Sequence, residues 1–178
     1  MKKNSKILII GHNSLTGNAL LRRLAKDGFK RIITVKSEPD LIDQRDMQLF
    51  FKKNRPEYIF FMDVKSGGII ANSAYPADFI YNNLQAQNNI IHCAWQVKAR
   101  KLLFVASSCV YPKNCPQPMK EEYLLTGSLE PTSEAFAAAK IMGIKMCQYY
   151  NRQYGTDFIS VIPATVFGQS DNFDLKMS

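Results

Sequence analysis

Metal-binding patterns and long apolar runs are both missing from this 178-residue sequence. It has only two histidines, His12 and His92, and its four cysteines form no C-x-x-C pair, so a zinc site is not expected. In a reducing compartment these thiols should be free. No apolar run approaches the roughly 18–20 residues that span a bilayer, and the run after the basic N-terminus is too short for a signal peptide. These absences favour a cytoplasmic protein without a metal ion or a membrane span.

The composition favours one globular domain. The hydrophobic fraction of 46% and the charged fraction of 21% are ordinary for a folded soluble protein, and the length is sufficient for a single buried core. The net charge of +8 suggests an anionic partner. Because the basic residues are scattered beside expected helix ends, we expect solvated surface charge and no nucleic-acid groove.

Short, wholly apolar runs alternate with longer helical patterns along the chain. Continuous hydrophobicity is what a parallel sheet covered on both faces requires. The expected strands are residues 6–11, 31–35, 57–62, 101–107 and 158–163. The expected helices are 16–27, 44–53, 76–97 and 131–154. This alternation predicts an α/β fold with a Rossmann-like, doubly wound parallel sheet over residues 1–168, followed by a polar tail at 169–178.

A glycine-containing turn, "GHNSLTG", follows the first expected strand and leads into the first helix. Such a turn lets backbone N–H groups and a helix N-terminus approach the pyrophosphate of a dinucleotide. Gly11 suits the tight turn and Gly17 suits close helix–strand packing, whereas Ser14 stands where the dinucleotide pattern has its middle glycine. Two glycines alone also fit a purely structural turn. The expected cofactor-binding residues here are Gly11, Asn13, Ser14, Leu15, Thr16 and Gly17.

Two charged residues after the second expected strand bear on the choice of cofactor. Lys36 would favour a 2′-phosphate and therefore NADP, while Glu38 leaves that choice open.

The alanine-rich segment "EAFAAAK" is expected to be helical, with Phe136 and Lys140 on one face. The periodicity alone predicts a helix whose phenylalanine packs against the rest of the protein.

Three longer segments carry a family resemblance: "GGIIANSAYPADFIYNNL", "SSCVYPKNCPQPMKEEYLLTGSLEPT" and "YNRQYGTDFISVIP". They closely resemble the GDP-L-fucose synthase family of extended short-chain dehydrogenases/reductases, and the resemblance covers nearly the whole chain. It implies an NADPH-dependent epimerase and reductase acting on GDP-4-keto-6-deoxymannose. The family's second half, with its substrate-binding domain and a histidine used in epimerisation, is expected to be absent from this chain.

The resemblance also implies roles for individual residues. Ser107 matches the serine that orients the keto group, and Cys109 matches the cysteine that exchanges protons during epimerisation. Lys140 matches the lysine that lowers the pKa of the catalytic tyrosine and holds the nicotinamide ribose. Phe136 occupies the position of that tyrosine, and a phenyl ring cannot donate a proton.

Other departures from the family pattern fall on the same functional positions. Asn13 replaces an arginine in the glycine loop, and Met62 and Asp63 replace small alanines that line the cofactor. Thr165 stands where the family has an asparagine that contacts substrate. Together with Ser14 and Phe136, these changes imply relaxed catalytic demand and weak or lost NADP binding.

Each site residue also has an ordinary structural interpretation. Ser107 could cap a strand end, Cys109 could be a semi-buried thiol, and Lys140 could be a solvated helix lysine.

Three functional hypotheses remain open. The first is a GDP-L-fucose synthase-like domain with impaired catalysis. The second is an active enzyme on a related GDP-sugar that uses Tyr111, Cys109 or water as its proton donor. The third is a non-catalytic partner or regulator of an intact paralogue. The family resemblance also implies a homodimer formed through the helices at 76–97 and 131–154.

Overall fold

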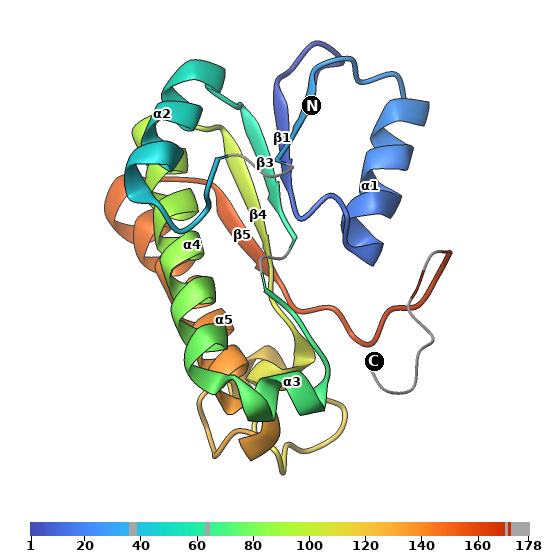
Figure 1. Cartoon of the computed structure of the whole chain (residues 1–178), viewed down its shortest axis with the longest axis vertical. Helices are drawn as coiled ribbons and strands as arrows, with labels where there is room; N and C mark the ends of the chain where they lie inside the picture. The colour runs from blue at the N-terminus through green and yellow to red at the C-terminus, as the bar shows by residue number, and fades with distance from the viewer. Residues whose placement is uncertain (36–38, 63–64, 170, 172–178) are drawn as a thin grey trace.

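The computed structural model of the chain describes residues 1–35, 39–62, 65–169 and 171 (Figure 1). Lys36, Glu38 and Asp63 lie outside the described residues, as does most of the predicted polar tail. The strands are β1 (Ile7–Ile10), β2 (Ile32–Thr34), β3 (Tyr58–Phe61), β4 (Lys101–Val105) and β5 (Phe158–Val161). The helices are α1 (Leu15–Lys26), α2 (Gln44–Asn54), α3 (Ile69–Ala74), α4 (Pro76–Gln96) and α5 (Glu134–Tyr154), with 3-10 turns η1 (Ser108–Val110), η2 (Glu121–Tyr123) and η3 (Pro131–Ser133).

All five strands form one parallel sheet in the order β2-β1-β3-β4-β5, which confirms the predicted fold class. The order reverses at β1, which pairs with both β2 and β3. Helix α1 covers one face of the sheet, and α2, α4 and α5 cover the other (Figure 1). In an open α/β sheet, ligands bind beyond the carboxyl ends of the strands next to such a reversal. The topology therefore places the candidate site at the edge where β1, β3 and β4 end.

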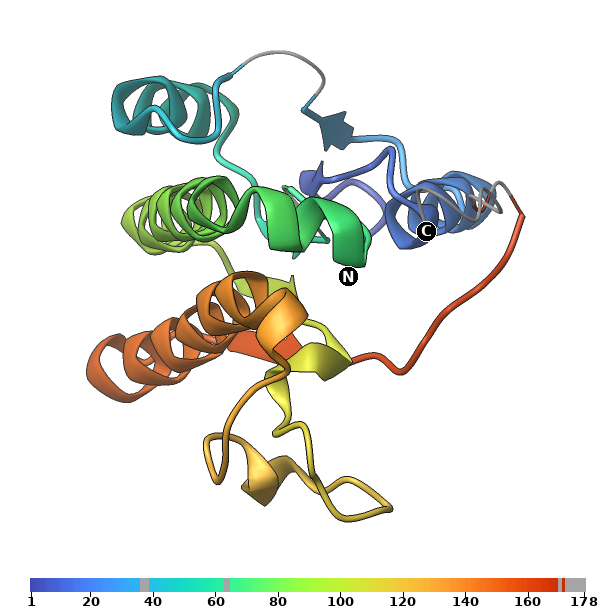
Figure 2. The ribbon, with the colours of Figure 1, turned by 60° about the horizontal axis from the view of Figure 1, so that its bottom comes forward.

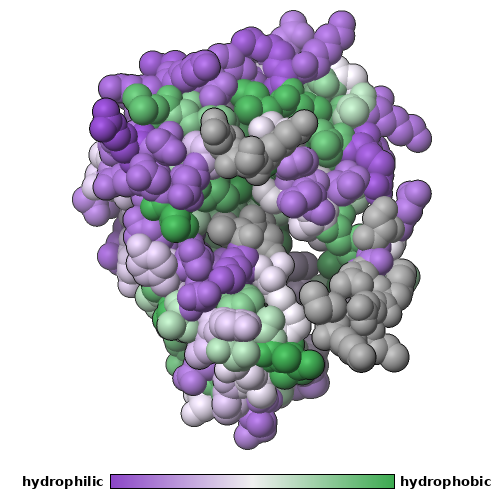
Figure 3. Space-filling model, viewed as in Figure 1, coloured by the Kyte–Doolittle hydropathy of each residue, from purple (hydrophilic) through white to green (hydrophobic). Residues whose placement is uncertain are grey.

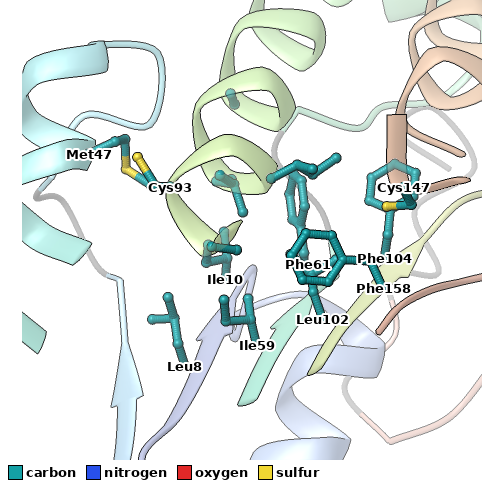
Figure 4. Packing of buried hydrophobic residues seen from close by; sticks show 14 of the residues in the cluster. Leu8, Ile10, Met47, Ile59, Phe61, Cys93, Leu102, Phe104, Cys147 and Phe158 are labelled. Atoms are coloured by element: carbon teal, nitrogen blue, oxygen red, sulfur yellow. The ribbon is translucent and has the colours of Figure 1, made fainter. Parts of the chain in front are cut away.

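The core is built from residues that alternate along the strands. The side chains that face α4 and α5 include Ile59, Phe61 and Phe104, all at most 1% exposed (Figure 4). The rings of Phe61 and Phe104 lie 5.3 Å apart. Helix α5 lies so close to β4 at Gly143 that a Cβ there would be only 2.5 Å from Phe104 Cζ. Burial of these aromatic rings holds α5 firmly on the sheet and so fixes the position of the residues it carries.

The β4–β5 end of the sheet is covered unevenly. Phe158 is buried beneath α5, whereas Ile159 and Val161 are 40% and 37% exposed on the opposite face. By contrast, all four residues of β1 are fully buried, as the unbroken apolar run predicts. Covering on both faces is thus complete at β1 and incomplete at β5.

Helix α3 was not predicted from the sequence. It has only six residues, and its first two, Ile69 and Ile70, are largely exposed, so no apolar face appears in the sequence. The helix starts after Gly68 and is fixed there by Asn72, whose Nδ2 donates to Gly67 O at 2.7 Å. A local side-chain hydrogen bond, not apolar periodicity, defines this element.

Within the described ranges, no helix combines the length and apolar character needed to cross a membrane. The same part of the chain contains no group of His, Cys, Asp or Glu side chains able to hold a metal ion.

Candidate functional site

The glycine loop between β1 and α1 is shaped by two glycines. Gly11 has a φ of +78°, a left-handed conformation that glycine adopts without strain. A Cβ on Gly17 would lie 2.0 Å from Gly11 O, so only glycine allows α1 to start this close to the end of β1. The sequence predicted both of these roles, a tight turn at Gly11 and close packing at Gly17.

Ser14 caps α1 and uses one of the N–H groups at the N-terminus of that helix. Its Oγ accepts a hydrogen bond from Gly17 N at 3.1 Å and donates one to Gly11 O at 2.8 Å. The first N–H groups of an α-helix have no partner within the helix, so those of Leu15 and Thr16 are available to a ligand. The loop therefore fits a phosphate group at a helix N-terminus. One N–H donor, that of Gly17, is already satisfied by the serine.

The second group of predicted residues lies two strands away from the glycine loop. Along the sheet edge, Ile10 pairs with Phe61, and Phe61 pairs with Phe104. Neighbouring strands are about 4.8 Å apart, so the end of β1 and the end of β4 are about 10 Å apart. A single extended ligand can reach both groups.

Lys140 is a buried cation, only 2% exposed, which rules out the solvated helix lysine considered above. Its Nζ donates to Val105 O at 3.1 Å, at the end of β4. The same nitrogen lies 5.9, 5.2 and 5.4 Å from the ring centroids of Phe61, Phe104 and Phe136. Cation–π attraction from these rings offsets part of the cost of burying the charge.

Phe136 packs as the helical pattern predicts. Its ring meets that of Phe79 edge to face, with the centroids 6.4 Å apart, and it also contacts the Lys140 ammonium. The position expected to hold a proton donor is therefore filled by a hydrocarbon ring that contacts the neighbouring lysine. No proton can leave from it.

Ser107 and Cys109 lie at the turn that follows β4, next to Lys140. Ser107 precedes η1 as its N-terminal flanking residue, in extended conformation, and Cys109 is in η1 itself. Burial raises the pKa of the Cys109 thiol, while a hydrogen bond with Ser107 and the positive charge of Lys140 act in the opposite direction. These interactions show that the structure brings Ser107, Cys109 and Lys140 together. Because the pKa is raised, the thiol is protonated at neutral pH.

Replacing Lys140 with methionine is expected to slow alkylation of Cys109. Loss of the nearby cation removes one of the influences that lower the pKa of this thiol, so less thiolate is present at any given pH. Alkylation by iodoacetamide, followed by mass spectrometry, should therefore be slower in Lys140→Met at each pH between neutrality and the pKa.

Lys145→Met, on the same helix, is the matched control and should leave the rate unchanged. Cys147 provides an internal reference, because burial raises its pKa to about 11. Equal or faster Cys109 alkylation in Lys140→Met would contradict the influence of Lys140 on the pKa of the Cys109 thiol.

Two further candidate residues, Thr165 and Tyr111, lie outside the group formed by Ser107, Cys109 and Lys140. The segment 162–168 runs from β5 towards α1 (Figure 2), and a Cβ on Gly168 would lie 3.8 Å from Leu15 Cδ1. Thr165 is exposed on this segment, in contrast to the buried Lys140. Tyr111 packs against the core, and burial is the main cause of its raised pKa.

Sequence reasoning missed the aromatic surroundings of Lys140. Phe61 and Phe104 were expected only as buried strand residues. Their positions at the carboxyl ends of adjacent strands were the available signal, because that edge carries the site in this fold class.

Comparisons with known proteins agree with this geometry. A putative GDP-L-fucose synthase of Arabidopsis thaliana is 49% identical over 97% of this chain, and the GDP-L-fucose synthase of Escherichia coli is 47% identical over 94%. The chain spans about half the length of these relatives, 53% in both cases.

A solved structure, described as a GDP-D-glycero-L-gluco-heptose synthase from Campylobacter jejuni in the presence of NADPH, superimposes with a TM-score of 0.94. It is 45% identical and covers 98% of this chain, which covers 52% of it. The model of the NAD dependent epimerase/dehydratase family matches residues 7–178. On the evidence of its parallel sheet, its glycine loop and this match, the chain belongs to the NAD dependent epimerase/dehydratase family.

Proposed function

We propose that this chain is the cofactor-binding part of an NAD(P)-dependent GDP-sugar epimerase/reductase whose reduction step is impaired. The observation that carries this proposal is the contact between Phe136 and Lys140, 5.4 Å from ring centroid to Nζ, beside Ser107 and Cys109. Ser107, Cys109 and Lys140 support a keto-sugar site in this proposal, but the residue at the proton-donor position has no acidic proton. GDP-sugars are proposed as substrates because the relatives carry names that refer to them.

The glycine loop is proposed to hold the cofactor pyrophosphate. The available N–H groups of Leu15 and Thr16 and the N-terminus of α1 would bind its phosphate oxygens. Gly11, Asn13, Ser14 and Gly17 form the rest of that loop, and Lys36, outside the described residues, is proposed to contact the 2′-phosphate of NADP. NADPH, when bound, supplies the hydride for reduction of the keto group.

The second group of residues is proposed to act on the sugar. Ser107 would orient the keto oxygen by donating its hydroxyl proton in a hydrogen bond, and Cys109 would hold an exchangeable proton at Sγ. Lys140 would place a positive charge near the ribose while its Nζ remains hydrogen-bonded to Val105 O. Thr165 is proposed to contact substrate from the segment that crosses towards α1.

One observation favours an active enzyme as the second candidate. The Cys109 thiol keeps its proton at neutral pH and lies near Lys140, so it could replace the missing tyrosine as donor. Tyr111 is a weaker candidate, because burial raises its pKa and makes it a poorer acid. A non-catalytic partner of an intact paralogue is the remaining alternative.

We also propose a homodimer and a cytoplasmic location. Helices α4 and α5 lie side by side on one face of the sheet, and they expose Tyr81, Met142 and Tyr149 by 61%, 47% and 53%. A second copy could cover these side chains by pairing the same two helices. The four cysteines are free, which suits a reducing compartment.

Replacing Ser14 with glycine is expected to tighten NADPH binding about tenfold or more. The change frees Gly17 N to donate to a phosphate oxygen, and a hydrogen bond to a charged group contributes about 1.5–3 kcal/mol. Loss of the serine cap in exchange for glycine costs only about a few tenths of a kcal/mol. Isothermal titration calorimetry on the purified chain measures both affinities.

Ser133→Gly is the matched control, because Ser133 flanks the start of α5 without capping it through its side chain. Its NADPH affinity should equal that of the wild type. Absence of NADPH binding in both the wild type and Ser14→Gly would refute the proposed cofactor site.

A further inference from the structure

A large cavity lies at the opposite edge of the sheet from the glycine loop. Its volume is about 830 Å³, within the range of about 300–1,000 Å³ typical of small-molecule sites. It is formed where α2, α4 and α5 end, and the surface around α2 is mainly hydrophilic in Figure 3. Along α5, its wall at Tyr154 is about 21 Å from Lys140. We call it the basic cavity; its lining includes Lys52, Arg55, Trp95, Lys98, Arg100 and Tyr154.

Three cations of the basic cavity have no acidic partner among the described residues. One carboxylate, that of Asp157, lines the cavity itself, and it is already paired with Lys101 at 2.9 Å. Glu57 outside the lining is likewise paired with Arg100 at 3.3 Å. In the part of the chain that the structure describes, no carboxylate pairs with Lys52, Arg55 or Lys98. Cations gathered around one cavity repel each other, and an anion placed between them relieves that repulsion.

Two of these cations are held by strained backbone. Arg55 and Lys98 have φ values of +46° and +57°, and Leu125 is the only other non-glycine residue of the described chain with a positive φ. Helices commonly end with such a residue, but it is usually glycine, sometimes asparagine. A long basic residue in this conformation costs stability, and retained strain of this kind is typical of functional sites.

The dipole of a helix attracts cations to its C-terminus, and this effect explains part of the positive charge around the basic cavity. Helix α2, however, already has Lys52 and Lys53 in its last turn. It therefore does not require Arg55 as well. Lys98 similarly follows α4 in a position where glycine would satisfy the backbone.

Aromatic side chains complete the basic cavity. The rings of Trp95 and Tyr154 lie 4.5 Å apart at an angle of 31°, and Tyr154 is 45% exposed. An exposed aromatic face can stack on a planar heterocycle, with an energy of about 1–3 kcal/mol for a base. Cations beside such a face match a ligand that has both phosphates and a ring.

We propose that the basic cavity binds a nucleoside polyphosphate, separately from the cofactor site at the other edge of the sheet. Lys52, Arg55 and Lys98 bind the phosphates, and the base stacks beside Tyr154. Lysine and arginine side chains in this role form charge-assisted hydrogen bonds with phosphate oxygens.

Intrinsic fluorescence provides a local test, because Trp95 is the single tryptophan of the chain. Titration with ATP should change Trp95 fluorescence and saturate, and ATP should bind more tightly than inorganic pyrophosphate, which lacks the ring. The double variant Arg55→Gly/Lys98→Gly should bind ATP at least about tenfold more weakly. Its melting temperature should be equal or higher, because glycine relieves the strain at both positions.

Two controls are needed. One tests whether ATP binding depends on this cavity and not on net charge alone, and the other tests whether the cavity is independent of the proposed cofactor site. Lys26→Ala/Lys30→Ala removes the same amount of charge elsewhere and should leave ATP binding unchanged. NADPH binding should be the same in Arg55→Gly/Lys98→Gly as in the wild type, so failure at one site is distinguishable from failure at the other.

Three outcomes would overturn the proposal. The first is a Trp95 signal that does not respond to ATP. The second is an equal loss of ATP binding in the Lys26→Ala/Lys30→Ala control. The third is tighter binding of a single-stranded oligonucleotide than of ATP at equal phosphate concentration, which would identify nucleic acid as the ligand instead.

Discussion

Under the proposed function, Phe136→Tyr is expected to raise the rate of keto-sugar reduction by about 10²–10⁴-fold, the usual contribution of a positioned proton donor. The ring that would carry the new hydroxyl already contacts the Lys140 ammonium, which is itself held by Val105 O. A nearby cation lowers the pKa of a phenol and makes it a better acid at neutral pH. NADPH consumption with GDP-4-keto-6-deoxymannose measures the effect.

A second measurement on the same variant needs no substrate. The difference in ultraviolet titration between Phe136→Tyr and wild type isolates the added phenol, which should ionise below the ordinary tyrosine pKa of about 10. Phe136→Leu keeps the site apolar without a hydroxyl and should show no gain in rate. A phenol that titrates at or above its ordinary pKa, together with an unchanged rate, would show that this position no longer supports acid catalysis.

Gly17→Ala should lower the free energy of unfolding by about 3 kcal/mol or more, at the upper end of the range for overpacking. The added Cβ would lie 2.0 Å from Gly11 O and 2.9 Å from His12 Cα, and both are backbone atoms that cannot simply rotate away. Alanine favours a helix over glycine by only about 1 kcal/mol, so the steric clash decides the sign. Urea denaturation measures the loss, and NADPH binding should disappear with it.

Gly28→Ala is the matched control for this substitution, at the other end of α1. Gly28 has a φ of +81°, but a Cβ there would have no neighbour within 4 Å. Its cost comes from the backbone conformation alone, about 1–2 kcal/mol. If both variants lose the same stability, the close approach of Gly17 to Gly11 does not determine how α1 packs.

The features that sequence predicted well are those with a repeated signal. The unbroken apolar run at residues 7–10 requires a strand buried on both faces, and the structure places β1 inside the sheet, between β2 and β3. The two glycines of the loop were recognisable because they come directly after that strand, at the spacing of a dinucleotide-binding turn. Close spacing along one helix also placed Phe136 and Lys140 on the same side.

The features that sequence could not predict depend on contacts between distant segments. The burial of Lys140 arises from Phe61 and Phe104 on two other strands, so a local pattern could not distinguish it from a solvated lysine. The start of α3, by contrast, depends on a local hydrogen bond from one asparagine side chain, which apolar periodicity does not reveal. The strained Arg55 and Lys98 look like ordinary charged residues in the sequence.

The position of β1 in the sheet has a consequence for folding during synthesis. Ile7 pairs with Ile32 on one side and with Tyr58 on the other, so β1 has both neighbours only after the chain through Phe61 has left the ribosome. Until then, its apolar side chains have no complete cover. Parallel pairing of this kind forms slowly because distant segments must meet first, and an exposed apolar strand favours aggregation meanwhile. The most buried strand of the finished protein is therefore made first and stays without its two neighbours until about a third of the chain has been synthesised.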